Sequence, residues 1–362
     1  MNQNNNIKNK ILYISNDLNK NPVGGRKNLT NLNQKILKDI FKKNFFSFEL
    51  QKKKISSLKN ILLALSGNID GITKKKIKII KNLIKKNDIK YLFVDGSNLG
   101  KISRKLSNKN IKIITFCHNV ETNFFLEKLK TFYNLKNLYI LVVNLLAELQ
   151  SVYFSDYLIF LNKRDKLMMN KYFFKKKSFI IPMCLDDKFK KYKNSINKKN
   201  YLIFVGSNFF GNMTGLEWYV RKIANKINYK TYIIGKNLLR EKFKKNSKIV
   251  FKGYVKNLNK FYKNSLFTVA PIFKGSGMKT KVAESLMHGK YIVGLKEAFI
   301  GYEKYEKKIG IKCNNADDYI KAINNLAKKK HYYFEPKLRK IYLENFSNYS
   351  MKDSYQKIFG KI

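Results

Sequence analysis

A glycine-rich turn, Gly275-Ser276-Gly277, is the part of this sequence best suited to hold a ligand. An apolar run that ends at Pro271 comes before the turn, and apolar residues at helical spacing follow it. Glycines let backbone N–H groups converge, and a helix that starts behind them adds the positive end of its dipole. The pattern therefore predicts an anion site in front of a short helix that begins near Gly277 and ends at Gly289.

Charged side chains lie at suggestive positions along this expected helix. Lys279 and Lys281 fall in its first turn, where cations oppose the helix dipole and are poor choices for stability alone. A bound anion in front of them would explain both residues. Glu284 lies about 10 Å further along the axis than Gly277, so its carboxylate could reach past a diphosphate to a sugar diol. An ordinary surface helix in a lysine-rich chain explains the same residues equally well, and the spacing alone leaves both interpretations open.

The block from Gly253 to Tyr302 resembles the donor-binding segment of retaining GT-B glycosyltransferases of the family 4 type, the glycosyl transferases group 1. The motifs that carry the resemblance are Gly253-Tyr254-Val255, Ala270-Pro271, Gly275-Ser276-Gly277, Lys279, Lys281, Glu284, Gly289 and Tyr291-Ile292-Val293. The family often has two glutamates in this block. The second corresponds to Glu284, whereas the first falls on Ser276, so this chain departs from the pattern at the position that helps to hold the transferred sugar.

The resemblance implies roles for these residues in binding a nucleotide-diphosphate sugar. Gly275, Ser276 and Gly277 would hold the diphosphate through backbone N–H groups, and Lys279 and Lys281 would neutralise its charge. Glu284 would bind the ribose hydroxyls, and Gly206, in the loop after the strand expected at Tyr201–Val205, would flank the diphosphate. Lys281 and Glu284, together with His118 of the N-terminal half, are the expected catalytic residues. No metal-binding motif stands in a suitable context, so we expect no metal and no cofactor besides the nucleotide sugar as co-substrate.

The N-terminal half opens like a Rossmann-like unit, with an apolar strand at Lys10–Ser15, a loop that contains Gly24-Gly25, and a helix from about Lys27. In the resembling family, a glycine pair at this place lets the backbone approach the ligands. The resemblance therefore implies that Gly24 and Gly25 line the acceptor side of a cleft. A tight turn that needs positive φ is nearly as good an explanation of the pair.

A second motif follows the strand expected at Ile111–Cys117. Its sequence is His118-Asn119-Val120-Glu121, and members of the same family often carry this tetrapeptide. The carboxyl ends of parallel strands are where open α/β sheets bind ligands, and Asp95 ends a neighbouring strand. The resemblance implies that His118 and Asn119 face the sugar. We expect Glu121 to have the structural role of capping the next helix.

Alternating apolar strands and helical segments predict an α/β protein, and the chain is long enough for two domains. We expect an N-terminal acceptor-binding domain at 1–185, a Lys- and Asn-rich linker at 186–200, a C-terminal nucleotide-sugar-binding domain at 201–345, and a helix at 346–362 that returns to the first domain. The resemblance implies the GT-B architecture, in which two Rossmann-like domains face each other across a cleft.

The formal net charge is +51, and a surface this basic attracts polyanions. A compositional bias towards Lys and Asn explains much of this excess. No recognised nucleic-acid-binding module is present, so we expect no specific nucleic acid partner. An anionic membrane surface is a more credible partner, because Phe41–Phe46 and Tyr172–Lys177 mix aromatic residues with lysine, although both stretches also fit a solvated face beside a core.

Three widely spaced cysteines fit a reducing compartment, and the polar N-terminus has no apolar signal core. The apolar stretch at 138–161 is interrupted by polar residues, which predicts a buried helix and strand. We therefore expect a cytoplasmic protein, peripheral at the inner face of the membrane. The sequence favours a retaining, metal-independent hexosyltransferase that transfers sugar to a glycan or lipid-linked glycan in cell-surface polysaccharide biosynthesis. The alternative is a non-catalytic protein of the same fold that binds polyanions or membrane surfaces.

Overall fold

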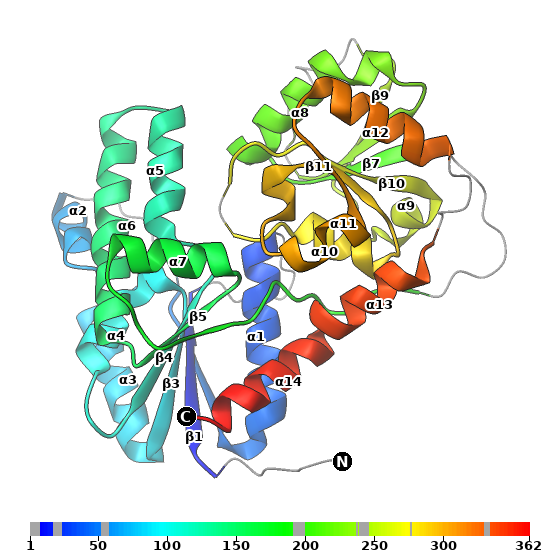
Figure 1. Cartoon of the computed structure of the whole chain (residues 1–362). Helices are drawn as coiled ribbons and strands as arrows, with labels where there is room; N and C mark the ends of the chain where they lie inside the picture. Colours follow the sequence, from blue (N-terminus) through cyan, green and yellow to red (C-terminus); the bar gives the residue numbers. More distant parts are fainter. Residues whose placement is uncertain are drawn as a thin grey trace. The chain divides into compact units, whose positions relative to one another are not determined.

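The structure is a computed structural model that describes residues 8–16, 24–51, 58–190, 200–236, 238, 246–275, 277–328 and 334–362 (Figure 1). The chain divides into two compact units. Unit 1 contains Met1–Pro182 and Met351–Ile362, and unit 2 contains Met183–Ser350. Residues 191–199 of the expected linker lie outside the described residues.

Unit 1 is built on a six-stranded sheet with the order β2-β1-β3-β4-β5-β6, in which every pairing is parallel. Its strands are β1 (Lys10–Ser15), β2 (Phe45–Glu49), β3 (Ile89–Asp95), β4 (Lys112–Cys117), β5 (Tyr157–Phe160) and β6 (Ser178–Ile180). Its helices are α1 (Gly25–Phe41), α2 (Leu58–Leu65), α3 (Lys74–Asn87), α4 (Gly100–Leu106), α5 (Glu121–Thr131), α6 (Leu135–Phe154) and α7 (Lys163–Tyr172). Helix α1 begins at Gly25, two residues before the expected start.

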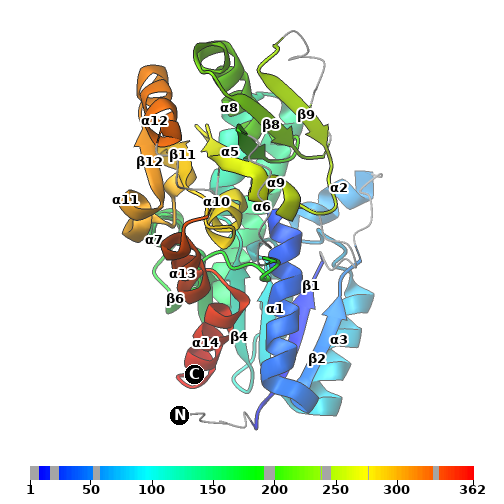
Figure 2. The ribbon, with the colours of Figure 1, turned by 90° about the vertical axis from the view of Figure 1, so that its right-hand side faces the viewer.

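Helices cover both faces of this sheet, because its central strands are buried on both sides. Leu12 and Ile14 of β1 point into a core with α3 and α4. The residue between them, Tyr13, points to the opposite face, where its hydroxyl donates to the carbonyl of Thr30 in α1 at 2.9 Å. Figure 2 shows α1 and α3 on either side of β1 and β2.

The C-terminal helix α14 (Asn348–Phe359) joins unit 1 through its residues from Met351 onward. The Tyr355 hydroxyl donates to Asn33 Oδ1 at 2.7 Å, and the ring of Phe359 meets that of Phe41 at 4.9 Å. This confirms the expectation that the C-terminal helix returns to the first domain. It also buries Phe41, so the stretch Phe41–Phe46 is not the exposed aromatic surface considered above.

Unit 2 has a second six-stranded parallel sheet, with the order β12-β11-β10-β7-β8-β9. Its strands are β7 (Tyr201–Val205), β8 (Lys230–Ile234), β9 (Ile249–Gly253), β10 (Ser265–Ala270), β11 (Ile292–Leu295) and β12 (Gly310–Cys313). Its helices are α8 (Phe210–Lys222), α9 (Asn259–Asn264), α10 (Thr280–Met287), α11 (Glu306–Ile309), α12 (Ala316–Lys328) and α13 (Pro336–Asn345). The α/β fold class with two Rossmann-like units is confirmed.

In each sheet the strand order reverses beside the first strand of the unit. In unit 1 the reversal lies between β1 and β3, and in unit 2 it lies between β7 and β10. The loops that leave neighbouring strands diverge at such a point, and the crevice between them is where open α/β sheets bind ligands. The residues that follow these four strands are therefore the first place to look for a site.

Candidate functional site

In unit 2, helix α8 packs directly against the chain that leaves β10. A Cβ added at Gly215 would lie 1.6 Å from the carbonyl oxygen of Pro271, and one added at Gly211 would lie 2.3 Å from that of Lys274. Only glycine fits at either place, since backbone atoms cannot give way. The start of α8 and the glycine-rich turn are therefore held together at the strand-order reversal, a contact that the sequence did not reveal.

The glycine-rich turn has the backbone conformation that its composition predicts. Gly275 has φ 154° and Gly277 has φ 63°, both in the region that favours glycine, while Ser276 lies outside the described residues. Lys279 is the N-cap residue of α10, so the helix begins three residues later than expected from Gly277. The Lys279 ammonium donates to the Gly277 carbonyl at 2.9 Å and pairs with Glu297 at 3.2 Å. Lys279 thus braces the turn, and much of its charge is already balanced.

Lys281 lies in the first turn of α10 and is buried, with 5% of its surface exposed. Its ammonium donates to Asn212 Oδ1 at 2.9 Å and lies 4.1 Å from the ring centre of Phe204. Burial lowers the pKa of Lys281 to about 7, with a further contribution from Lys279 and an opposing one from Glu284. An anion that bound here would favour the charged ammonium and would gain a strong ion pair.

Asn212, which connects this lysine to the first loop of unit 2, is a site residue that the sequence analysis missed. Its side-chain N–H group donates to the Ser207 carbonyl at 3.0 Å, which aims its oxygen at Lys281. Gly206 makes room for it, because a Cβ there would lie 2.8 Å from Asn212 Nδ2. No local signal marks Asn212, since its partner lies 69 residues away in the sequence.

Glu284 lies on the same helix as Lys281 and is half-buried. The Tyr262 hydroxyl donates to Glu284 Oε2 at 3.3 Å, and the ring of His288 stacks on the ring of Tyr262 at 4.6 Å. Burial raises the pKa of Glu284 to about 7, although Tyr262, Lys281 and Lys188 act in the opposite direction. Near neutral pH, both Glu284 and Lys281 can therefore change their protonation state when a ligand binds.

In unit 1, the ends of β3 and β4 bring His118 and Asp95 together as the parallel topology predicts. His118 Nε2 lies 2.6 Å from Asp95 Oδ1 and 3.4 Å from Thr30 Oγ1, and the imidazole and the carboxylate are both buried. Asp95 also accepts hydrogen bonds from the Tyr13 hydroxyl and from Asn33 Nδ2. The imidazole is thus held in one orientation by a fully buried carboxylate.

Asp95 carries its negative charge despite its burial. Burial by itself would raise the pKa of Asp95, but the charge and hydrogen bond of His118 and the hydrogen bonds of Tyr13 and Asn33 outweigh it and lower the pKa below the usual value. Among the described residues, His118 Nδ1 is buried without a hydrogen-bond partner. This nitrogen is the ring atom left to interact with a ligand.

The other predicted residues of unit 1 lie at the starts of α1 and α5. Gly24 is the N-cap of α1 with φ 104°, and a Cβ there would meet open space, so the backbone conformation favours glycine. Gly25 is the first residue of the helix, and Asn119 is half-buried in the turn before α5. Arg26 connects the two starts, since it donates to Glu121 at 2.9 Å and to Asn98 at 2.7 Å.

Glu121 lies in the first turn of α5 as expected, but the hydrogen bonds that cap this helix come from Glu148 of α6. One carboxylate oxygen of Glu148 accepts from the backbone N–H of Glu121 and the other from that of Thr122, both at 2.9 Å. Ser97 also donates to this carboxylate at 2.9 Å. Burial raises the pKa of Glu148 to about 7. A capping residue from another helix leaves no pattern in the local sequence.

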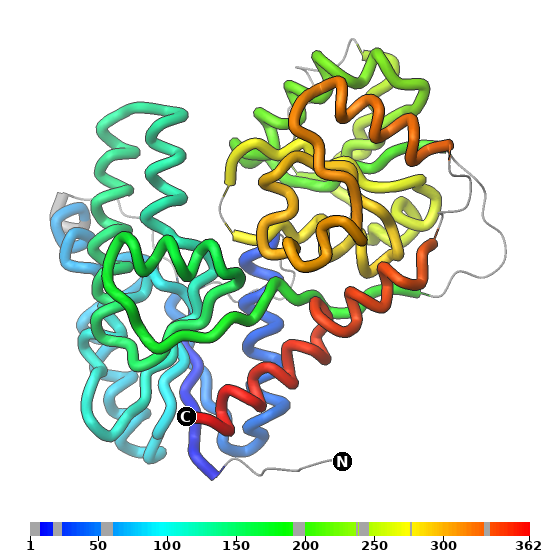
Figure 3. Tube along the Cα trace, in the orientation of Figure 1, coloured from blue at the N-terminus to red at the C-terminus, as the bar shows by residue number. Residues whose placement is uncertain are grey.

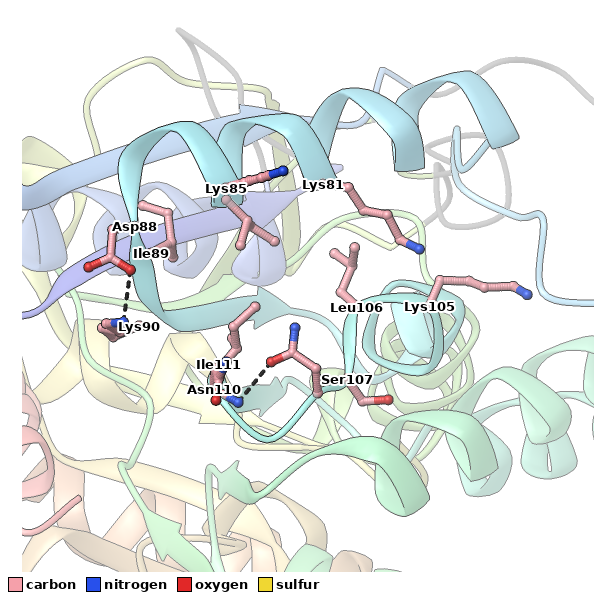
Figure 4. A pocket seen from close by; sticks show the side chains of 12 residues that line it. Lys81, Lys85, Asp88, Ile89, Lys90, Lys105, Leu106, Ser107, Asn110 and Ile111 are labelled. Carbon is pink, nitrogen blue, oxygen red and sulfur yellow. Dashed lines mark hydrogen bonds and ion pairs between the residues drawn. The ribbon is translucent and has the colours of Figure 1, made fainter.

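Neither group of residues forms a metal centre in the part of the chain that the structure describes, where no three His, Cys, Asp or Glu side chains cluster suitably. A hollow of about 500 Å³ in unit 1 also lies apart from the predicted residues (Figure 4). It adjoins Ile89 and Ile111, at the starts of β3 and β4, whereas His118 follows the end of β4. The expectation of metal independence stays a prediction.

Comparison with known proteins relates both units to one architecture. Residues 199–329 match a family described as "Glycosyl transferases group 1", a range that includes Gly206, Asn212, Lys281 and Glu284. The complete fold is similar to that of sucrose-phosphate synthase from Thermosynechococcus elongatus, with a TM-score of 0.74 and 11% identity over 98% of this chain and 99% of that one. The chain has the GT-B fold.

Two further structures with this fold were determined for other proteins. Anabaena HepE in complex with UDP-glucose gives a TM-score of 0.69 and 9% identity over 98% of this chain and 100% of that one. The lipopolysaccharide outer core galactosyltransferase WaaB gives a TM-score of 0.63 and 11% identity over 98% of this chain and 100% of that one. No curated protein sequence matches the chain. The comparisons thus show the GT-B fold for the chain and a match of residues 199–329 to the glycosyl transferases group 1.

Proposed function

We propose that this protein transfers a sugar from a nucleotide-diphosphate sugar to a glycan or lipid-linked glycan, with retention of the anomeric configuration. The observation that carries the proposal is Lys281, a buried cation beside a glycine turn at the strand-order reversal of unit 2. A buried ammonium whose hydrogen bond goes to a neutral amide is costly to maintain, and a diphosphate would stabilise it.

Unit 2 would bind the donor. The backbone N–H groups of Gly275, Ser276 and Gly277 would hold the diphosphate, with Gly206 beside it, and Glu284 would accept hydrogen bonds from the ribose hydroxyls. As the bond between the sugar C1 and the diphosphate oxygen breaks, negative charge grows on the leaving group. Lys281, assisted by Lys279, would stabilise that charge where it develops.

Unit 1 would bind the acceptor. His118, held by Asp95, would offer Nδ1 to a sugar hydroxyl, while Asn119, Gly24 and Gly25 would line the acceptor side. In the retaining reaction the acceptor hydroxyl oxygen bonds to C1 on the face that the diphosphate leaves, and the departing diphosphate takes the acceptor proton. Such a reaction needs no separate enzymic base, and the two lysines would supply the positive charge that a metal supplies elsewhere.

A role in cell-surface polysaccharide biosynthesis on the cytoplasmic side of the membrane completes the proposal. It is supported by the likeness to WaaB, a lipopolysaccharide outer core galactosyltransferase, and by the likeness to HepE, whose structure contains UDP-glucose.

The test is a thermal-shift screen of the full-length protein over nucleotide-diphosphate sugars, followed by transfer assays with the donor that stabilises it. We expect one donor to raise the unfolding temperature, NMR of the product to show the donor's anomeric configuration, and transfer to persist in a metal chelator. An inverted product would overturn retention, and loss of activity in the chelator would overturn metal independence. If no nucleotide sugar stabilises the protein, the proposed donor site is wrong.

A further inference from the structure

Helix α6 presents an apolar surface to solvent along its whole length. Its inner side is buried in unit 1 and includes Val143, Ala147 and Glu148. On the opposite side, residues three, four or seven positions apart are exposed: Leu135 79%, Leu138 38%, Val142 37%, Leu149 39% and Tyr153 61%. Leu145 and Leu146 fall on the same arc and are half-buried. A surface helix of a soluble protein normally turns polar residues outward, so this stripe, about 30 Å long, needs an explanation.

Neighbouring elements extend the stripe at both ends. The turn between α5 and α6 exposes Phe132 by 51% and Tyr133 by 80%. At the other end, the ring of Phe174 lies edge-on to that of Tyr153 at 5.9 Å. Figure 3 shows α5 and α6 as an antiparallel pair joined by this turn.

Helix α2 lies beside α6 and adds to the same surface. The Tyr139 hydroxyl donates to the Ile61 carbonyl at 2.8 Å, which joins the two helices. Beyond this contact, Ile61 is 40% exposed and Leu62 is 70% exposed. We call the whole surface the apolar face: Ile61, Leu62, Phe132, Tyr133, Leu135, Leu138, Val142, Leu149, Tyr153 and Phe174.

Within the described residues, α6 is also the helix that is long and apolar enough to cross a membrane. The hydrogen bonds of Glu148 indicate instead that α6 lies on the surface of unit 1. Its buried carboxylate caps α5 through the N–H groups of Glu121 and Thr122 and accepts from Ser97, so α6 is tied into unit 1. A spanning helix would have to break these bonds and place Glu148 in hydrocarbon.

Lysines border the apolar face at both ends. Lys130 and Lys136 flank Phe132–Leu135, and Lys175 and Lys177 flank Phe174 from the other side; all four lysines are exposed. Exposed aromatic side chains with adjacent lysines match the boundary between lipid headgroups and acyl chains, where rings settle and anionic headgroups attract cations. A second copy of this chain, with its own charge of +51, would bring like charges to the same border.

We propose that the apolar face of α2, α6 and the α5–α6 turn docks on an anionic lipid bilayer, with α6 lying along the membrane surface. This inference goes beyond the proposed sugar transfer and stands without it. It also differs from the sequence-based expectation, because of the two aromatic stretches considered there only Tyr172–Lys177 adjoins this surface.

The experiment is co-sedimentation of the full-length protein with vesicles of phosphatidylcholine alone or mixed with phosphatidylglycerol. The test variant is Leu135→Gln with Leu138→Gln and Leu149→Gln, and the control is Leu343→Gln, an equally apolar residue of α13 that is 38% exposed. We expect the native protein and the control to bind the anionic vesicles, and the triple variant to bind them on the order of tenfold more weakly or worse. Because the replaced side chains are exposed, all three proteins should unfold at similar temperatures.

Two outcomes would overturn the proposal. If the triple variant binds anionic vesicles as well as the native protein does, the attraction is only that of scattered lysines. If the native protein is a dimer without lipid in analytical ultracentrifugation and the triple variant is a monomer, a second copy covers the apolar face. No donor sugar enters either measurement, so the result does not depend on the proposed activity.

Discussion

The two groups of predicted site residues differ in how their charges are balanced. Asp95 in unit 1 is surrounded by internal partners, His118, Tyr13 and Asn33, so its negative charge is balanced without a ligand. Lys281 in unit 2 is also buried. Within the described residues, however, its ammonium donates to the neutral side-chain amide of Asn212 and not to a carboxylate. The first arrangement holds the His118 imidazole in one orientation, whereas the second leaves a positive charge that can pair with a bound anion. Substitutions in the first should therefore cost stability, and substitutions in the second should cost activity.

The largest expected effect is on the stability of unit 1. Asp95→Ala leaves the buried groups of His118, Tyr13 and Asn33 without their shared acceptor, and should lower the free energy of unfolding by about 3–5 kcal/mol. Asp39→Ala is the matched control, since Asp39 pairs with Lys352 at the surface and should contribute less than about 1 kcal/mol. Urea denaturation measures both. Equal losses in the two variants would show that the Asp95 cluster is not the internally balanced one.

Lys281→Met, unlike Asp95→Ala, should lower activity without lowering stability. The change removes the positive charge proposed to stabilise the leaving diphosphate, so kcat/KM for sugar transfer should fall roughly 10²–10³-fold. Stability should stay the same or rise, because a desolvated ammonium is replaced by an apolar chain of similar length. Lys296→Met, at an exposed lysine, is the control and should change neither quantity. Steady-state kinetics and thermal unfolding together test this prediction. If Lys281→Met is destabilised while its folded fraction keeps full activity, Lys281 has a structural role and not a catalytic one.

The pH dependence of donor binding tests whether Lys281 and Glu284 of unit 2 both contact the donor. The pKa of Lys281 is lowered to about 7 and that of Glu284 is raised to about 7. Above pH 7 Lys281 loses its proton and its attraction for the diphosphate; below pH 7 Glu284 gains a proton and becomes a poorer acceptor for ribose hydroxyls. Donor affinity should therefore peak near pH 7 and fall severalfold within one pH unit on either side.

Isothermal titration calorimetry with an intact nucleotide sugar measures this profile, because its diphosphate diester does not titrate near neutral pH. Lys281→Met should remove the alkaline decline, and Glu284→Gln should remove the acidic one. A flat profile in the native protein would mean that neither group meets the donor.

The remaining prediction concerns the backbone at the start of α1. Gly24→Ala forces a Cβ onto φ 104° and should cost roughly 1–2 kcal/mol of stability, although the space around it is open. Gly25→Ala, one residue later and inside the helix, should instead be neutral or stabilising by up to about 1 kcal/mol. Chemical denaturation distinguishes the two, and a stable Gly24→Ala variant would show that the turn does not require glycine.

The contacts that could be predicted from the sequence share one property: they follow from the order of parallel strands. Asp95 and His118 end two strands that the alternating pattern marks clearly, and neighbouring parallel strands place their carboxyl ends side by side. The pairing of Lys281 with Asn212 has no such rule behind it. It depends on how α8 packs against the chain after β10. Gly211 and Gly215 permit this close packing, but their presence in the sequence does not predict it. Glu148 capping α5 from another helix escaped prediction for the same reason.

By itself, the sequence determined the alternation of strands and helices and the glycine turn with its positive φ angles. These follow from local backbone preferences and from hydrophobic periodicity, which act over a few residues. Only the tertiary structure decided which charges are balanced, that Lys279 braces a turn while Lys281 keeps its charge available, and which side of the largely apolar helix α6 is left uncovered. The physical reason is that burial and charge balance depend on every neighbour in space, and most of those neighbours are distant in the chain.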